Sequence, residues 1–177
     1  QIGALKAHLA VVLPEIRVDA HHVYLSVAAE LGYGLYGPIS ERSWLAEIPY
    51  AALLYPGQRD ALERLWRRQC RGLRSCRDVE LEAVCRRVES ASDRYLACID
   101  WEHCLRAGLS ICLGQLTSTL YFIRRIRQRA PDVRIVAGGS SCAGALGKSL
   151  LETFSEIDFV ISGEGERPLA QLARSLL

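Results

Sequence analysis

Hydrophobic and polar positions alternate with two different periods along this chain. Apolar residues recur every three or four positions over 2–13, 23–31 and 44–54, which predicts amphipathic helices. Residues 16–20 alternate between apolar and polar, which is typical of a strand, and the glycines and proline within 34–38 indicate a loop. The N-terminal third is therefore expected to be mostly helical, with one strand and one loop.

Two long charged segments, 58–74 and 78–98, also have the composition of helices and interrupt the alternation of elements. Acidic residues lie among the many arginines there, and this mixture favours solvated helix faces with intrahelical ion pairs. The alternative interpretation is that these arginines form a surface that binds phosphate or a peptide. We interpret residues 57–103, with approximate bounds, as a helical insertion.

The remaining sequence alternates strands and helices. Helices of about 10–15 residues between short apolar runs predict βαβ units and a parallel sheet. We therefore expect an α/β protein, a Rossmann-like doubly wound parallel sheet that carries the helical insertion, in a single domain spanning residues 1–177. The expected elements are strands at 105–112, 133–137 and 157–161, and helices at 116–129, at 143–154 and from about residue 167.

Three loops follow the predicted strands, and the carboxyl ends of parallel strands share one edge of a sheet, where ligands bind in open α/β folds. Glycines there remove Cβ atoms where a ligand approaches the backbone, serine and glutamine side chains can form hydrogen bonds, and a helix N-terminus attracts acceptor groups. In isolation each loop also fits an ordinary turn and helix cap. The candidate ligand-binding residues are Ser110, Cys112, Leu113, Gly114, Gln115, Thr117, Ser118, Gly138, Gly139, Ser140, Ser141, Gly163, Glu164 and Gly165.

The sequence offers no catalytic candidate. It contains neither the GxxxxGK[ST] phosphate loop nor the GxGxxG dinucleotide fingerprint, and no acid–base pair, activated nucleophile or metal cluster stands out. Its seven cysteines include no CxxC pair and no CxxxCxxC cluster motif, so they are interpreted as free thiols of a cytoplasmic protein. These absences favour a domain that carries a cofactor.

Charge and hydropathy argue against two classes of partner. The formal net charge is +2, too small to indicate nucleic-acid binding, and no run of 18 apolar residues is present that could span a membrane. The chain contains no methionine and begins within a helical pattern, so we expect it to be a fragment of a longer protein.

Several segments resemble the cobalamin-binding domain of class B radical-SAM enzymes, in particular the methyltransferases that mature ribosomal peptides and the related tryptophan 2-C-methyltransferase. The segments that carry this resemblance are 108–126, with its GLS and Gln115, then 131–139 (PDVRIVAGG) and 158–166 (DFVISGEGE). Residues 2–9 and 44–56 are similar to that subgroup as well, and the resemblance is weakest across 58–100.

The resemblance implies that the chain binds cobalamin as the methyl-carrier domain of a radical-SAM C-methyltransferase and is not catalytic by itself. Ser110, Gly138 and Gly139 match the family's serine and glycine elements that hold the nucleotide tail. The parent enzyme would be a transferase that holds a [4Fe–4S] cluster and S-adenosylmethionine in a separate radical-SAM barrel, absent from this chain, and acts on a small-molecule or peptide substrate. The hard chemistry would belong to the cofactors.

The resemblance also implies base-off cobalamin without a protein histidine on the cobalt. Other cobalamin proteins use a DxHxxG loop whose histidine ligates the metal, and Asp19, Ala20 and His21 form a fragment of that motif. However, the glycine position is occupied by Tyr24, and the segment lies on a predicted strand away from the expected loop. Two other functions stay open: a dinucleotide-binding oxidoreductase domain, and a non-catalytic corrinoid-binding module that uses the 58–100 helices as its partner surface.

Overall fold

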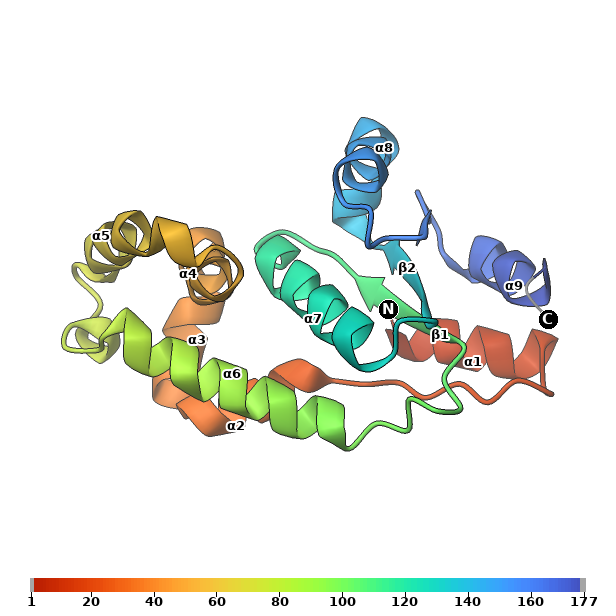
Figure 1. Ribbon diagram of the computed structural model, residues 1–177, viewed down its shortest axis with the longest axis horizontal. Coiled ribbons are helices and arrows are strands. Elements are labelled where there is room, and N and C mark those ends of the chain that lie inside the picture. The colour runs from red at the N-terminus through yellow and green to blue at the C-terminus, as the bar shows by residue number, and fades with distance from the viewer. Residues whose placement is uncertain (1, 176–177) are drawn as a thin grey trace. The chain divides into compact units, whose positions relative to one another are not determined.

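The computed structural model describes residues 2–175 and has a mixed α/β fold with a small open sheet of three parallel strands. The described chain forms two compact units. The first combines residues 2–21, 105–112 and 132–175, and the second combines 22–104 and 113–131. Figure 1 colours the elements of both units in chain order, from red to blue.

The first unit contains the sheet. Ser110 is paired with Gly138, and Ala137 with Val160, so the carboxyl ends of all three strands lie at the same edge. Residues 135–137 of the middle strand are fully buried, as expected for a strand of a parallel sheet that is covered on both faces. The strands, in their spatial order, are β1 (Arg106–Ser110), β2 (Arg134–Gly138) and β3 (Phe159–Val160).

Asp158 joins two strands at the opposite end of the sheet, where β2 and β3 begin. Its carboxylate accepts a hydrogen bond from the backbone N–H of Ile135 at 2.6 Å and another from the guanidinium of Arg134 at 3.0 Å. Asp158 immediately precedes β3, so these bonds join β3 to the start of β2. The first residue of the DFVISGEGE segment therefore has a structural role at the edge away from the candidate loops.

Three helices complete the first unit. Helix α8 (Gly144–Thr153) packs beside β3, where an added Cβ at Gly147 would lie 3.0 Å from Cγ1 of Val160. Helix α1 (Ile2–Val12) packs against α9 (Glu166–Ser175). The buried residues of that helix pair are Leu9, Leu13, Ala170 and Ala173.

The strand expected at residues 16–20 is wrong, because this segment has no regular secondary structure. Ile16 and Val18 are instead half-buried against the cluster formed by α1 and α9. The alternation of apolar and polar residues here therefore reflects burial of one side of an extended segment that is not part of the sheet. Period-two burial makes a strand only where a neighbouring strand supplies the hydrogen-bond ladder.

The doubly wound topology is not observed among the described residues. A doubly wound sheet extends in both directions from its first strand and reverses strand order at a switch point. The sheet here has the order β1-β2-β3, without a reversal. It corresponds to a single βαβαβ succession, in which α7 (Leu116–Arg129) and then α8 separate the strands along the chain.

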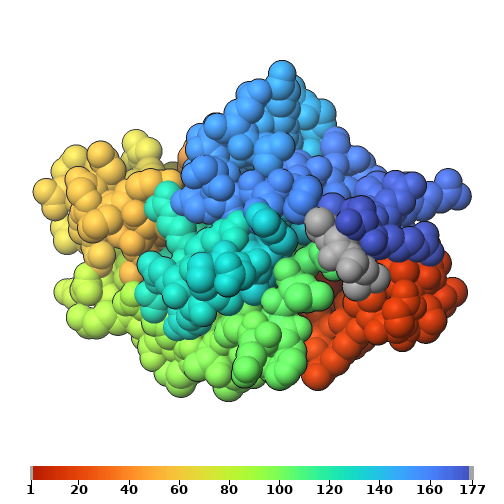
Figure 2. Space-filling view, turned by 45° about the vertical axis from the view of Figure 1, so that its right-hand side comes forward, coloured from red at the N-terminus to blue at the C-terminus, as the bar shows by residue number. Residues whose placement is uncertain are grey.

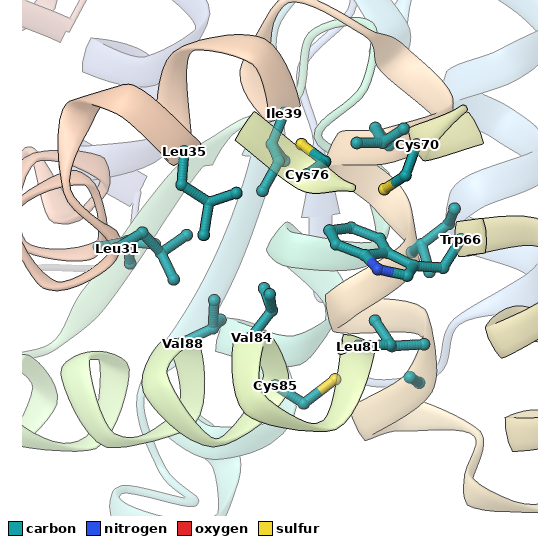
Figure 3. Packing of buried hydrophobic residues seen from close by; sticks show 14 of the residues in the cluster. Leu31, Leu35, Ile39, Trp66, Cys70, Cys76, Leu81, Val84, Cys85 and Val88 are labelled. Atoms are coloured by element: carbon teal, nitrogen blue, oxygen red, sulfur yellow. The ribbon is translucent and has the colours of Figure 1, made fainter. Parts of the chain in front are cut away.

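The second unit is entirely helical and has its own core. Figure 3 shows part of this core, where Trp66 lies among aliphatic and cysteine side chains. The indole Nε1 of Trp66 donates a hydrogen bond to the backbone carbonyl of Val79 at 2.9 Å, which satisfies its polar atom. Besides α7, the elements are α2 (Val23–Leu31), α3 (Tyr33–Ser40), α4 (Ser43–Leu54), α5 (Arg59–Cys70) and α6 (Leu81–Ala97), with single 3-10 turns η1 (Pro56–Gln58) and η2 (Arg74–Cys76).

The loop expected at 34–38 is also wrong, because these residues form most of α3. Leu35 and Ile39 are four positions apart and both are buried in the core of the second unit. Their burial outweighs the low helix propensity of the glycines and of Pro38. The break that the sequence does encode is Gly32, whose φ of +74° separates α2 from α3.

No helix within residues 2–175 has both the length and the apolar composition needed to cross a membrane.

Candidate functional site

The loops that follow the three strands lie next to one another in the first unit. The backbone N–H of Ile111, just after β1, donates to the carbonyl of Gly138 at 2.7 Å, and the N–H of Ser141 donates back to the carbonyl of Ile111 at 3.0 Å. On the other side of β2, the N–H of Ile161 donates to the carbonyl of Ala137 at 2.8 Å. Hydrogen bonds between backbones therefore fix the loops after β1 and β2 against each other at the edge of the sheet.

Gly139 is required by this close packing of loops. Its φ is +102°, and a Cβ at this position would lie 2.6 Å from the carbonyl oxygen of Ile111 and 3.0 Å from Oγ of Ser110. The sequence interpretation assigned the missing Cβ to the approach of a ligand. The structure shows that the space is taken by the chain's own loop after β1.

Three serine hydroxyls at this edge form no hydrogen bond with any described residue: those of Ser110, Ser140 and Ser141. Ser110 and Ser141 are half-buried, and Ser140 is exposed. Gly138 and Gly163 leave space at the backbone, because an added Cβ meets nothing closer than 3.8 Å at Gly138 and nothing within 4 Å at Gly163. We refer to Ser110, Gly138, Ser140, Ser141 and Gly163 as the strand-end site.

The residues after β3 have separate roles. The hydroxyl of Ser162 accepts a hydrogen bond from the backbone N–H of Gly144 at 2.9 Å, and thereby caps the first residue of α8. Gly165 faces α1, since a Cβ there would lie 3.2 Å from Cδ2 of Leu5. Glu164 is exposed, and it has no ion pair or hydrogen bond among the described residues. Glu166 begins α9, where its negative charge interacts favourably with the positive end of the helix dipole.

The thiol of Cys142, which follows Ser141 in the chain, is not set up as a nucleophile. Cys142 is fully buried, and burial raises the pKa of its thiol; the neighbouring Cys112 raises it further. A raised pKa keeps the thiol protonated at neutral pH, whereas the reactive form of cysteine is the thiolate. Cys142 is therefore not a candidate for covalent chemistry at this site.

The remaining candidate residues belong to the second unit, at the start of α7, and there a carboxylate of the chain is already bound. Glu47 of α4 accepts hydrogen bonds from the backbone N–H groups of Leu116 at 2.9 Å and Thr117 at 2.7 Å. The hydroxyl of Thr117 donates to the backbone carbonyl of Glu47 at 2.8 Å. The helix N-terminus that was expected to attract a ligand thus binds Glu47 instead.

The neighbours of Thr117 also have local structural roles. Gly114 has a φ of +77°, and a Cβ there would lie 3.1 Å from Cα of Ser43. The carbonyl of Gln115 accepts from the hydroxyl of Ser118 at 3.0 Å and from the N–H of Thr119 at 3.0 Å. Leu113 is 84% exposed. These residues shape the start of α7 and the turn before it.

Replacement of Glu47 by alanine is expected to destabilise the second unit by about 2–3 kcal/mol, because two N–H groups of α7 lose their acceptor and the helix loses a favourable charge. Urea unfolding followed by tryptophan fluorescence measures this, since all three tryptophans lie within residues 22–104. The exposed Glu41 provides a matched control, and its change to alanine should alter stability by less than about 0.5 kcal/mol. Equal effects of the two substitutions would contradict the capping role.

Comparison with known proteins adds no relative to this geometry. No family model matches the chain, and the searches of curated proteins and of solved structures find no match either. Among residues 2–175, no three histidine, cysteine, aspartate or glutamate side chains gather in a way that could hold a metal ion. Only the residues of the site itself therefore bear on its function.

Sequence reasoning missed Glu47 and Ser162, which cap α7 and α8. Ser162 follows a strand and precedes glycine, a pattern that suggests a ligand contact as readily as a cap. Glu47 carries no local signal, since it lies 69 residues before Leu116 in the sequence. Only the packing of α4 beside α7 brings the carboxylate to the helix end.

Proposed function

We propose that this chain binds cobalamin at the strand-end site, as the methyl-carrier domain of a cobalamin-dependent radical-SAM C-methyltransferase with a Rossmann-like core. The observation that carries the proposal is the set of three partnerless hydroxyls, from Ser110, Ser140 and Ser141, beside glycines at one edge of a parallel sheet. The resemblance of 131–139 and 158–166 to that family supports the same assignment. The start of α7 is left out of the proposed contacts because Glu47 occupies its N–H groups.

The chemistry of the strand-end site fits the nucleotide tail of cobalamin. The tail presents a phosphate, a ribose and amide groups, and a serine hydroxyl can donate to the first and both donate to and accept from the others. Gly138 and Gly163 leave room for the tail to approach the backbone. Hydroxyls that lack a partner within the protein lose no internal hydrogen bond when a ligand binds.

In this proposal the chain's residues bind and orient, and do no chemistry themselves. Ser110 and Ser141 would fix the tail along the sheet edge, with Ser140 closing its exposed side. Bound cobalamin would supply a methyl-carrying cobalt, and S-adenosylmethionine and the iron–sulfur cluster would belong to the barrel of the parent enzyme. The sheet contributes a rigid support, because hydrogen bonds between the β1 and β2 loops hold Ser110 and Ser141 at fixed positions.

The strand-end loops contain no histidine over 110–112, 138–141 and 161–165. We therefore propose that no histidine of these loops would coordinate the cobalt of bound cobalamin. Paramagnetic resonance of bound cob(II)alamin tests this directly, because an axial nitrogen splits the cobalt signal. Splitting that changes when the protein's histidines carry nitrogen-15 would overturn the assignment.

The binding test uses hydroxocobalamin, incubated with the protein and then desalted. We expect the corrinoid absorption bands to elute with the protein. Replacement of Ser110, Ser140 and Ser141 by alanine together should raise the dissociation constant by about 30–100-fold, since each lost hydrogen bond contributes about 1 kcal/mol or less. Isothermal titration calorimetry measures the dissociation constant.

The matched control replaces Ser149 and Ser155 by alanine, because both are exposed serines of the first unit without a hydrogen bond among the described residues. This variant should bind within about twofold of the original chain. Tighter binding of NAD than of hydroxocobalamin would instead support the dinucleotide-binding alternative. Elution of folded protein without corrinoid would reject cobalamin binding.

A further inference from the structure

Helix α5 and the turns after it carry a basic surface that the chain does not neutralise. Between residues 64 and 77 there is no aspartate or glutamate, and every arginine there is exposed. Figure 2 shows this yellow segment at the molecular surface. The arginines are Arg64, Arg67, Arg68, Arg71, Arg74 and Arg77.

Four of these arginines occupy one face of the helix and its C-terminus. Arg64, Arg67, Arg68 and Arg71 follow the spacing of three, four and seven residues that places side chains side by side. Like charges at this spacing destabilise a helix. Of these four arginines, only Arg67 has an acidic partner among the described residues. Its Nε lies 2.9 Å from Oε1 of Glu63. The guanidinium groups of Arg64, Arg68 and Arg71 have no acidic partner among the described residues.

Several arginines elsewhere in the second unit are paired with acids. Arg94 of α6 pairs with Glu30 of α2 at 2.5 Å. Arg129 of α7 pairs with Asp93 at 3.0 Å, and Arg125 binds the same carboxylate through its Nε at 3.0 Å. Arg64, Arg68 and Arg71 therefore differ from these arginines, and also from Arg59 at the start of α5, which pairs with Glu82.

The basic face of α5 also bounds an open groove of about 630 Å³. Exposed Ala61 and half-buried Leu65 provide apolar atoms between the arginines. A second hollow of about 240 Å³ continues past Arg71 to Arg77. We call the first of these the arginine groove, which is lined by Ala61, Arg64, Leu65, Arg67, Arg68 and Arg71.

We propose that the arginine groove binds an acidic segment of a polypeptide. Guanidinium groups recognise carboxylates through paired hydrogen bonds, and the four arginines extend over about 10 Å of helix, a length that suits successive carboxylates of an extended chain. Ala61 and Leu65 would contact an apolar side chain between the acids. The site goes beyond the proposed cobalamin function and does not depend on it.

Two features favour a peptide over a nucleic acid. Single-stranded nucleic acids bind where exposed aromatic side chains stack on bases, and the lining of the arginine groove includes no aromatic residue. The whole chain has a formal net charge of only +2, which does not favour the general attraction to nucleic acid that a strongly basic protein has. A free phosphate would use one or two arginines and leave the rest of the row without a function.

The test uses a fluorescently labelled dodecapeptide of glutamates around a central leucine, with binding followed by anisotropy at low and physiological salt. Replacement of Arg64, Arg68 and Arg71 by glutamine together should weaken binding by at least about tenfold. The control replaces Arg17, Arg86 and Arg167 by glutamine, three exposed arginines elsewhere whose loss changes the net charge equally. The control should bind within about twofold of the original chain.

A second variant, Ala61→Glu, separates binding from folding. A carboxylate near the N-terminus of α5 and three residues before Arg64 supports the helix, so the variant should remain folded. The same carboxylate would occupy the groove and weaken peptide binding by about tenfold. Circular dichroism verifies the helix content in parallel.

Equal binding of a peptide with glutamine in place of glutamate, equal losses in the Arg17/Arg86/Arg167 control, or tighter binding of single-stranded RNA of the same charge would each overturn the proposal. The triple serine variant of the strand-end site should bind the acidic peptide normally. Failure of cobalamin binding is thereby distinguishable from failure of the arginine groove.

Discussion

Alanine at Gly139 is expected to destabilise the first unit by about 2–4 kcal/mol. The backbone there has a φ of +102°, a conformation that side chains with a Cβ rarely adopt. The new methyl group would also lie 2.6 Å from the carbonyl of Ile111 and force it to move. That carbonyl accepts the 3.0 Å hydrogen bond from Ser141, so the displacement would also weaken the link between the β1 and β2 loops.

The loss of stability caused by alanine at Gly139 has to be measured within the sheet of the first unit. All the tryptophans and tyrosines lie within the second unit, so their fluorescence does not follow the first. Amide hydrogen exchange over 106–110 and 134–138 does, because these strands pair directly. Faster exchange in both strands, with the second unit unchanged, is the expected result.

Two further glycines serve as controls for Gly139. Gly163 has a φ of +88° and an empty surrounding, so its change to alanine measures the conformational cost alone, about 1 kcal/mol. Gly108 in β1 has no positive φ and no atom within 4 Å of an added Cβ, so alanine there should be neutral or slightly stabilising. If alanine at Gly139 were no worse than alanine at Gly163, the clash with Ile111 would be refuted.

Replacement of Trp66 by alanine is expected to destabilise the second unit by about 3–5 kcal/mol. The indole is 1% exposed and lies in the core of the second unit, part of which Figure 3 shows. Its removal leaves a large cavity and deprives the Val79 carbonyl of its 2.9 Å hydrogen bond. Urea unfolding, followed by the fluorescence of the two remaining tryptophans, measures the change.

Trp44 is the matched control for this substitution. It lies in the same unit but is 69% exposed, so alanine there should change the free energy of unfolding by less than about 0.5 kcal/mol. Similar losses for the two tryptophans would mean that Trp66 does not anchor the core.

Elements with a strong periodic pattern could be predicted from the sequence. The helices expected at 23–31 and 116–129 have the same bounds in the structure, because their apolar positions recur at the spacing of one buried face. Helix α3 could not be predicted, since its glycines and Pro38 oppose a helix that only tertiary burial of Leu35 and Ile39 supports. Local composition indicates only helix propensity, and in α3 the burial of side chains in the core outweighs a low propensity.

The sequence also indicated which loops meet, because the ends of parallel strands share an edge. It could not indicate which groups in those loops were already bound within the chain. The N–H groups of Leu116 and Thr117 have an internal partner in Glu47, whereas the hydroxyls of Ser110, Ser140 and Ser141 have none among the described residues. That distinction depends on contacts between residues far apart along the chain.

The pairing of α1 with α9 has a consequence for synthesis on the ribosome. Arg174 donates a hydrogen bond to the carbonyl of Val12 across 162 residues, and Leu9 and Leu13 are covered by Ala170 and Ala173. At ribosomal speeds, roughly 10–30 seconds separate the two helices as they are made. During that interval the apolar face of α1 lacks its partner, and a chaperone that shields nascent chains would have an apolar binding site there.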